Sequence, residues 1–291
     1  MTIESFDITV VAGKSTLWVD SNRIKECLQR YRDGGIESLG VNPQRGYSLR
    51  DLSFLAEYTD IGGLVVVHPV GGDFDLAPLL ELESLNSLTI SGPITLPVAR
   101  FPKLRVLRGN WHPTLTLSGC QSLEVLDLSG YRSAQKDLTG LPSMSALGEL
   151  SVTSSNIVNT NGIERLGQLV SLELAYLPQL RRLDGIETLV ALKALTLEHC
   201  KKCDVVEKVS GLGGLEVLSV ISSGELASVS FVANMPHLEE FRFVGTNVRD
   251  GDLTPLLRLK RVHFLPKRHY SHTPEQLRQA IDGRVVRTGG G

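Results

Sequence analysis

A leucine pattern that returns about every two dozen residues is the feature that most constrains the fold of this chain. The six-residue unit L-x-x-L-x-L, in which Ile, Val, Phe or Gly can replace Leu, occurs eleven times. Its starting positions are Ile36, Ile61, Leu85, Leu104, Leu123, Leu147, Leu169, Leu192, Leu215, Leu238 and Leu259. The intervals between them are 19 to 25 residues, and the starts span 223 residues. This regularity indicates a repeat architecture.

Each unit predicts a short strand that buries alternate residues. Positions 4 and 6 point to one side of a strand, whereas position 5 points to the other side. One unit is too small to bury its leucines alone, so neighbouring units must stack and share a core. Leucine supplies 47 of the 291 residues and aromatic residues only 5%, which fits a core that repeats one aliphatic side chain. We therefore expect an α/β solenoid with about eleven parallel strands.

These units resemble leucine-rich repeats, and the region from Leu147 to Leu238 is similar to the ~22-residue variety of bacterial internalins. The resemblance covers about residues 36–264. It implies a right-handed horseshoe whose strands line the concave side, and it implies a bacterial protein. Because this fold serves many partners, the resemblance concerns architecture more than function.

The turn after each strand departs from the family pattern. Leucine-rich repeats are expected to carry Asn or Cys three residues after position 6. Cys200 fits this rule, Asn156 and Asn247 lie one residue late, and Leu177 does not fit. We therefore expect no continuous asparagine ladder, and some turns must satisfy their backbone groups in another way.

Both ends of a solenoid need caps, because the outermost coils would otherwise expose their core. Residues 1–35 are expected to form an N-terminal cap with one helix, and residues 36–265 the repeats. Residues 266–291 are expected to form a basic C-terminal cap with a helix and a flexible tail. Eight Lys or Arg in 258–291 face only two acidic residues there.

The cap helices have recognisable start and stop signals. Ser21 or Asn22 is the expected N-cap of the first helix, and residues 3–19 are expected to contribute a strand pair beside it. Residues 273–276 (TPEQ) read as a capping box with Pro at the first helical position. The helix that follows is expected to be short and to end near Gly283.

The charge balance argues against two classes of partner. Lys and Arg number 30 against 32 Asp and Glu, which gives a net charge of −2 and a pI near 6.4. General binding to nucleic acids or anionic membranes needs an excess of positive charge. No run approaches the ~18 uncharged apolar residues of a membrane span. We expect neither nucleic acid nor membrane as partner.

The start of the chain and its cysteines predict a cytoplasmic protein. Glu4 and Asp7 stand where the basic region of a secretion signal would be, and Lys14 interrupts any apolar run. Four cysteines in 291 residues do not make a disulfide framework. Reduced thiols are the simplest interpretation.

The sequence shows little of the chemistry that enzymes and metal sites need. Residues 13–16 (GKST) resemble the end of a phosphate-binding loop, but Ile8 stands where that motif needs a glycine. Cys200 and Cys203 could supply half of a zinc site, which needs four ligands. The seven histidines form no Ser–His or Cys–His arrangement. We expect no catalytic residue, no metal, no cofactor and no enzyme.

The concave side of the predicted sheet is the candidate binding surface. Its middle is acidic, arginines stand before and after it, and aromatic residues lie near one rim. Aromatic side chains beside charged groups are typical of interface hot spots. The candidate partner-binding residues are Arg105, Arg108, Trp111, Asp127, Tyr131, Glu149, Glu173, Tyr176, Glu198 and His199.

These features favour a non-catalytic protein–protein interaction module that binds a protein partner on its concave face. The acidic centre favours a partner with a basic surface, and such surfaces are common on proteins that act on nucleic acids. A bacterial cytoplasmic inhibitor, such as an immunity protein against a basic toxin, is one concrete form. The resemblance to internalins implies an alternative, a secreted adhesin or host-directed effector. Nucleic-acid binding by the basic C-terminal cap is a further, less favoured hypothesis.

Overall fold

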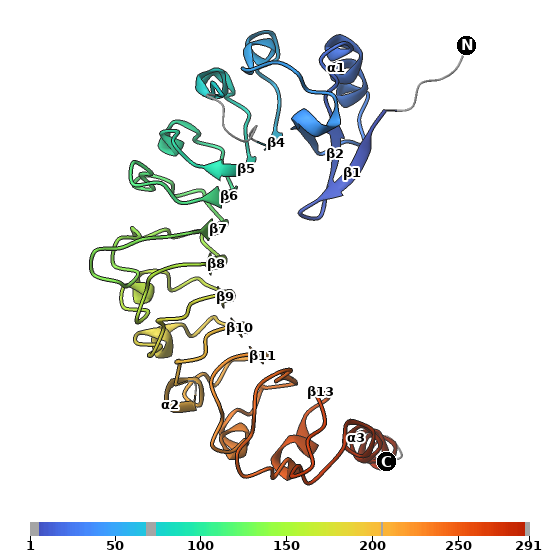
Figure 1. Ribbon diagram of the computed structural model, residues 1–291, viewed down its shortest axis with the longest axis vertical. Helices are drawn as coiled ribbons and strands as arrows, with labels where there is room; N and C mark the ends of the chain where they lie inside the picture. The colour runs from blue at the N-terminus through green and yellow to red at the C-terminus, as the bar shows by residue number, and fades with distance from the viewer. Residues whose placement is uncertain (1–5, 68–73, 205, 289–291) are drawn as a thin grey trace. The chain divides into compact units, whose positions relative to one another are not determined.

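The computed structural model describes residues 6–67, 74–204 and 206–288. The chain divides into two compact units, Met1–Leu128 and Ser129–Gly291. In each unit the strands lie side by side in chain order (Figure 1). The boundary between the units falls within the repeats.

The first unit begins with a hairpin and continues with parallel strands. Its strands and helix are β1 (Ile8–Val11), β2 (Lys14–Trp18), α1 (Ile24–Arg32), β3 (Ser38–Val41), β4 (Gly63–Val66), β5 (Ser87–Pro93), β6 (Val106–Asn110) and β7 (Val125–Ser129). β1 is antiparallel to β2, and β2 to β6 pair in parallel. The 3₁₀ helices η1 (Pro43–Arg45), η2 (Ser53–Glu57), η3 (Ala77–Glu81) and η4 (Val98–Arg100) lie on its returning segments.

The second unit repeats one coil several times and ends in a helix. Its elements are β8 (Glu149–Thr153), β9 (Ser171–Ala175), β10 (Ala194–Glu198), α2 (Val206–Val209), β11 (Val217–Ile221), β12 (Glu240–Arg242), β13 (Arg261–His263) and α3 (Pro274–Thr288). β8 to β13 pair in parallel. The 3₁₀ helices η5 (Ile163–Arg165), η6 (Ile186–Thr188), η7 (Ser230–Asn234) and η8 (Thr254–Arg258) occupy the returning segments.

The strands confirm the predicted repeat. Each of β3 to β13, eleven strands in the described residues, begins two residues after the start of one predicted unit. In the second unit Leu150, Leu172, Leu195 and Leu218 stand in register, and all are at most 2% exposed. Stacked units thus share one leucine core, as positions 4 and 6 of the pattern require.

The N-terminal helix forms, but without the predicted side-chain cap. Arg23 is the N-cap residue of α1 and makes no capping hydrogen bond. The Ser21 hydroxyl instead accepts from the Ser48 backbone N–H at 2.8 Å, and the Asn22 N–H donates to Asp20. The Ser21 side chain therefore serves a loop beside the helix, and neither predicted residue caps α1. The strand pair is confirmed as β1–β2, although residues 3–5 lie outside the described residues.

The C-terminal capping box is confirmed and the predicted helix end is wrong. The Thr273 N–H donates to Gln276 Oε1 at 2.8 Å, and the Gln276 N–H donates to Thr273 Oγ1 at 3.3 Å. α3 then continues to Thr288. Gly283 sits inside the helix with open space around it, and a single helical glycine costs only about 1 kcal/mol. The predicted flexible tail, residues 289–291, lies outside the described residues.

Candidate protein-binding face

In the second unit, alternate strand residues point away from the leucine core and form what we call the open face. β8 to β11 supply three such residues each, and β12 and β13 supply two each. The open face comprises Glu149, Ser151, Thr153, Ser171, Glu173, Ala175, Ala194, Thr196, Glu198, Val217, Ser219, Ile221, Glu240, Arg242, Arg261 and His263. The residues between them are the buried leucines and their equivalents, except Val262 of β13, which is half-buried.

Three carboxylates gather on the β8–β10 part of the open face. Glu149 lies on β8, Glu173 on β9 and Glu198 on β10, and the parallel register places Glu173 directly between Ser151 and Thr196. Neighbouring strands are about 4.8 Å apart and residues rise about 3.3 Å along a strand, so the three carboxylates form a diagonal row about 16 Å long across the three strands. Glu149 is exposed, and the other two are half-buried. The three carboxylates make this part of the open face negatively charged.

An exposed aromatic pair stands beside these carboxylates. The rings of Tyr176 and His199 are stacked, with centroids 4.7 Å apart and 22° between their planes. The Tyr176 hydroxyl donates to Glu198 Oε1 at 3.3 Å, and His199 Nε2 lies 3.8 Å from the same oxygen. The negative charge of Glu198 raises the pKa of the Tyr176 hydroxyl above its ordinary value. Tyr176 remains 52% exposed, so the pair offers a flat contact surface.

The backbone at this pair is held in an unfavourable conformation. Tyr176 and His199 have φ of 55° and 51°, and Ser154 and Ser222 occupy the same place in neighbouring coils with φ of 52° and 46°. Each N–H bonds to the next coil, as that of Tyr176 does to the Glu198 carbonyl at 2.8 Å. A left-handed non-glycine residue costs roughly 1–2 kcal/mol. Gly245 fills this place in a later coil, so bulky rings here are not required by the fold.

The β12–β13 part of the open face is basic and contains one buried carboxylate. Glu240 is only 3% exposed because Arg242, Arg261 and His263 surround it. Arg261 Nε lies 2.6 Å from Glu240 Oε2, and His263 Nε2 lies 3.6 Å from Oε1. Burial raises the pKa of the Glu240 carboxyl, but the hydrogen bonds and charges of the two arginines outweigh it and hold this pKa below its ordinary value.

Four of the binding residues predicted from the sequence lie in the first unit, not on the open face of the second unit. Arg105 is exposed, and its Nε donates to Glu124 Oε1 at 2.8 Å. This hydrogen bond and the charge of Glu124 raise the pKa of Arg105. Arg108 on β6 and Asp127 on β7 are half-buried residues next to core leucines, and Trp111 follows β6 and is also half-buried.

Tyr131 was predicted to contact a partner, but its side chain lies in the core, so this prediction is wrong. Its side chain is 3% exposed, and burial raises the pKa of its hydroxyl. Gly130 takes the left-handed place after β7 with φ of 74°. Tyr131 therefore occupies the next place in the coil, which Leu177 and Cys200 fill elsewhere with fully buried side chains. The sequence could have revealed this burial, since Tyr131 follows position 6 of its unit by three residues, as Leu177 and Cys200 do.

The inward place after each strand also carries a polar ladder that the sequence analysis missed. Thr246 Oγ1 accepts from the Ser223 N–H at 3.1 Å and donates to the Val220 carbonyl at 2.7 Å. Ser223 Oγ accepts from the Cys200 N–H at 3.1 Å, and Cys200 Sγ donates to the Leu174 carbonyl at 3.3 Å. Hydroxyl and thiol groups here satisfy the backbone groups that an asparagine would satisfy.

The C-x-x-C pair shows no feature of a reactive or metal-binding site. Burial raises the pKa of the Cys200 thiol to about 11 and that of Cys203 to about 12. Thiolates are the metal-binding and nucleophilic form. Within the described parts of the chain, no three His, Cys, Asp or Glu side chains are placed to hold one metal ion. None of the described helices has the length and apolarity that a membrane span requires.

Solved structures with a similar chain path identify the fold. An internalin (inlF) of Listeria monocytogenes matches with a TM-score of 0.56 at 16% identity, covering 84% of this chain and 70% of that one. A leucine-rich repeat protein of Leptospira interrogans matches with a TM-score of 0.50 at 20% identity, covering 80% and 62%. The fold is that of the leucine-rich repeat proteins. The predicted repeat class and solenoid are thus confirmed.

A further similarity likewise concerns the fold alone. Toll-like receptor TLR13, solved as a complex with a single-stranded RNA, matches with a TM-score of 0.54 at 16% identity. That match covers 84% of this chain but only 41% of the receptor. The chain spans less than two thirds of the receptor and of the Leptospira protein. By sequence it matches no protein-family model and no curated protein.

Proposed function

We propose that this chain is a non-catalytic module that binds a protein partner on the open face around Tyr176 and His199. The exposed stacked pair carries the proposal. Both rings project from left-handed backbone that glycine would adopt at lower cost. Large aromatic side chains flanked by charged groups dominate the energy of protein interfaces. Selection for contact with another molecule accounts for rings in this place.

The partner is proposed to present a basic surface. Glu198 contacts the pair, Glu173 and Glu149 extend the negative charge across β9 and β8, and a cation from the partner can also stack on the Tyr176 ring. RNA, which TLR13 binds in its solved complex, would place phosphates against these carboxylates. Like charges in contact are unfavourable, so the charge of the open face favours protein over RNA.

The specific form that we propose is a bacterial cytoplasmic inhibitor, such as an immunity protein that covers a basic toxin. A surface that meets a basic patch on a nucleic-acid-acting protein would mask the patch that this protein needs for its own substrate. A second candidate is a secreted adhesin or host-directed effector, favoured by the similarity of fold to a Listeria internalin. Recovery of the protein outside the cells after fractionation would favour the second candidate over the first.

Affinity capture with a charge-matched pair of variants tests the proposal. Glu149→Lys, Glu173→Lys and Glu198→Lys together reverse the open face. Three exposed carboxylates elsewhere in the unit provide the matched control: Glu187→Lys, Asp204→Lys and Glu275→Lys. Wild type and control are expected to retain the same protein from the native cell, identified by mass spectrometry, and the open-face variant is expected to lose it. Equal capture by all three forms would contradict the proposed site.

A further inference from the structure

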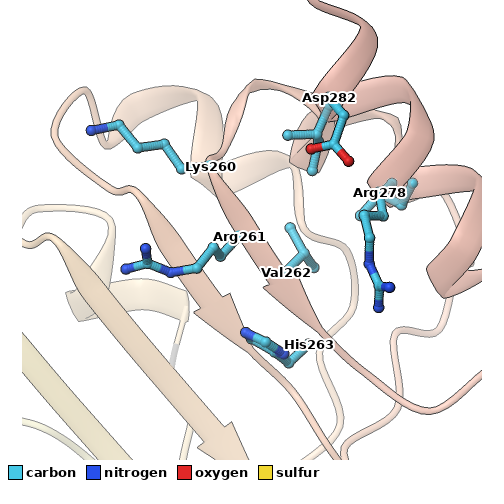
Figure 2. A pocket seen from close by; sticks show the side chains of 8 residues that line it. Lys260, Arg261, Val262, His263, Arg278 and Asp282 are labelled. Carbon is cyan, nitrogen blue, oxygen red and sulfur yellow. The ribbon is translucent and has the colours of Figure 1, made fainter. Parts of the chain in front are cut away.

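A pocket of about 240 Å³ lies between β13 and α3, at the end of the open face (Figure 2). Its apolar lining comes from Val262 on β13 and from Leu277 and Ile281 on α3. Leu277 and Ile281 are 1% and 7% exposed, so they form a fixed floor under the opening. The pocket has room for about one amino-acid side chain.

The rim of this pocket is predominantly basic. Arg261 and His263 line it from β13 and Lys260 from the position before that strand, whereas Arg278 and Asp282 line it from α3 (Figure 2). Its lining residues carry a formal charge of +2 with a neutral histidine, and two of its three cations are already paired with Glu239 and Glu240. The third cation, Arg278, is therefore the one that favours an anionic occupant.

Arg278 is the rim cation that remains available to a ligand. Lys260 Nζ already lies 2.6 Å from Glu239 Oε1, and Arg261 Nε lies 2.6 Å from Glu240. Arg278 is exposed, and within the described residues its guanidinium makes no ion pair and no hydrogen bond. In Figure 2 its side chain extends from α3 away from Asp282.

The last strand, β13, adds a backbone hydrogen-bond donor at its edge beside α3. β13 ends the strand order of its unit, and its ladder to β12 runs through the Arg261 N–H and the His263 carbonyl. In a parallel ladder the intervening residue points its N–H and carbonyl the other way. The Val262 N–H therefore faces the edge that α3 borders, where an oxygen acceptor can meet it.

We propose that this pocket binds an acidic side chain, flanked by an apolar residue, from the protein partner. This inference rests on the proposed function for the macromolecular source of the ligand. The cationic rim suits a carboxylate, and the apolar floor suits the neighbouring side chain better than it suits a free phosphate. β13 lies three strand spacings, about 14 Å, from β10. The partner then carries an acidic group about this far from its basic patch.

A pair of blocked dipeptides tests the pocket directly. In NMR titrations of the full chain, acetyl-Leu-Glu-amide is expected to shift the Val262 and Leu277 amide signals. The isosteric acetyl-Leu-Gln-amide, which lacks the carboxylate, is expected to bind at least about tenfold more weakly. Arg278→Gln is expected to weaken the Glu peptide about fivefold. Arg268→Gln, an exposed arginine of the same basic end outside the pocket lining, is the matched control and should change nothing.

Several results would overturn the proposal that this pocket binds an acidic side chain. Absence of Glu-peptide binding, equal binding of both peptides, or an Arg278→Gln variant that binds like wild type would each do so. Inorganic phosphate that shifts the same signals at lower concentration would assign a phosphate ligand instead. These failures are distinct from failure of the proposed function, because reversal of Glu149, Glu173 and Glu198 would still abolish capture of the partner.

Discussion

Replacement of Thr246 by valine is the sharpest test of how the coils are held together. Valine has the shape of threonine without the hydroxyl, and Thr246 is 2% exposed. The change leaves the Ser223 N–H and the Val220 carbonyl without the partner they have at 3.1 and 2.7 Å. Each buried polar group left unsatisfied costs about 1–3 kcal/mol. We therefore expect Thr246→Val to lower the free energy of unfolding by about 2–6 kcal/mol, because both groups are affected.

Urea denaturation followed by circular dichroism measures this loss, and Thr246→Ser is the matched control. Serine keeps the hydroxyl and loses one methyl group, which costs about 1 kcal/mol. Amide exchange provides a local readout, since the Ser223 N–H should exchange faster in Thr246→Val than in Thr246→Ser. The reasoning is refuted if Thr246→Val is as stable as Thr246→Ser, or if Ser223 exchanges equally in both.

Two further predictions concern the strained backbone and the buried carboxylate. Ser154→Gly should raise the free energy of unfolding by about 1 kcal/mol in urea melts, because glycine adopts the φ of 52° at little cost; Ser154→Ala is the control and should give no gain. The lowered pKa of Glu240 stabilises the fold above the pKa of an unfolded glutamate, and this contribution disappears as pH falls through the lower folded pKa. Glu240→Gln should therefore destabilise the protein at pH 7 by about 1–3 kcal/mol, and denaturant midpoints of variant and wild type should converge as the pH falls below the lowered pKa of Glu240; a pH-independent difference would contradict the charge argument.

The strands could be located from the sequence because each leucine-containing unit holds one strand. A residue four places into each unit must face the shared core, and Leu172 and Leu195 do so at 1% exposure or less. Each strand consequently begins at the same offset from its unit. The capping box at Thr273 was predictable for a related reason, since both of its hydrogen bonds join residues only three apart.

The errors arise where a local signal competes with tertiary structure. Ser21 is an ordinary N-cap by sequence, but its hydroxyl accepts from the Ser48 N–H, which only the folded chain brings near. Gly283 reads as a helix stop, yet nothing crowds it and the helix continues. Neither outcome follows from the residues around these positions.

The candidate site could be predicted only in part. Strand alternation is enough to predict that Glu149, Glu173 and Glu198 point to the open face. The Tyr176–His199 stack, in contrast, depends on two side-chain rotations and a left-handed turn. Tyr131 was misplaced because its rim position was assigned by distance from the strand, whereas the left-handed Gly130 turns the chain inward there. The hydroxyl ladder through Ser223 was missed because the expected turn residues were Asn and Cys.

The most direct test of the account is calorimetric titration of the captured partner into wild type and into Tyr176→Ala/His199→Ala. Paired aromatic residues at an interface centre cost about 2 kcal/mol or more each on truncation. The account predicts a dissociation constant at least about a hundredfold weaker for the double variant, with an unchanged urea midpoint. Unchanged affinity in a folded double variant would show that the partner is bound elsewhere on the chain.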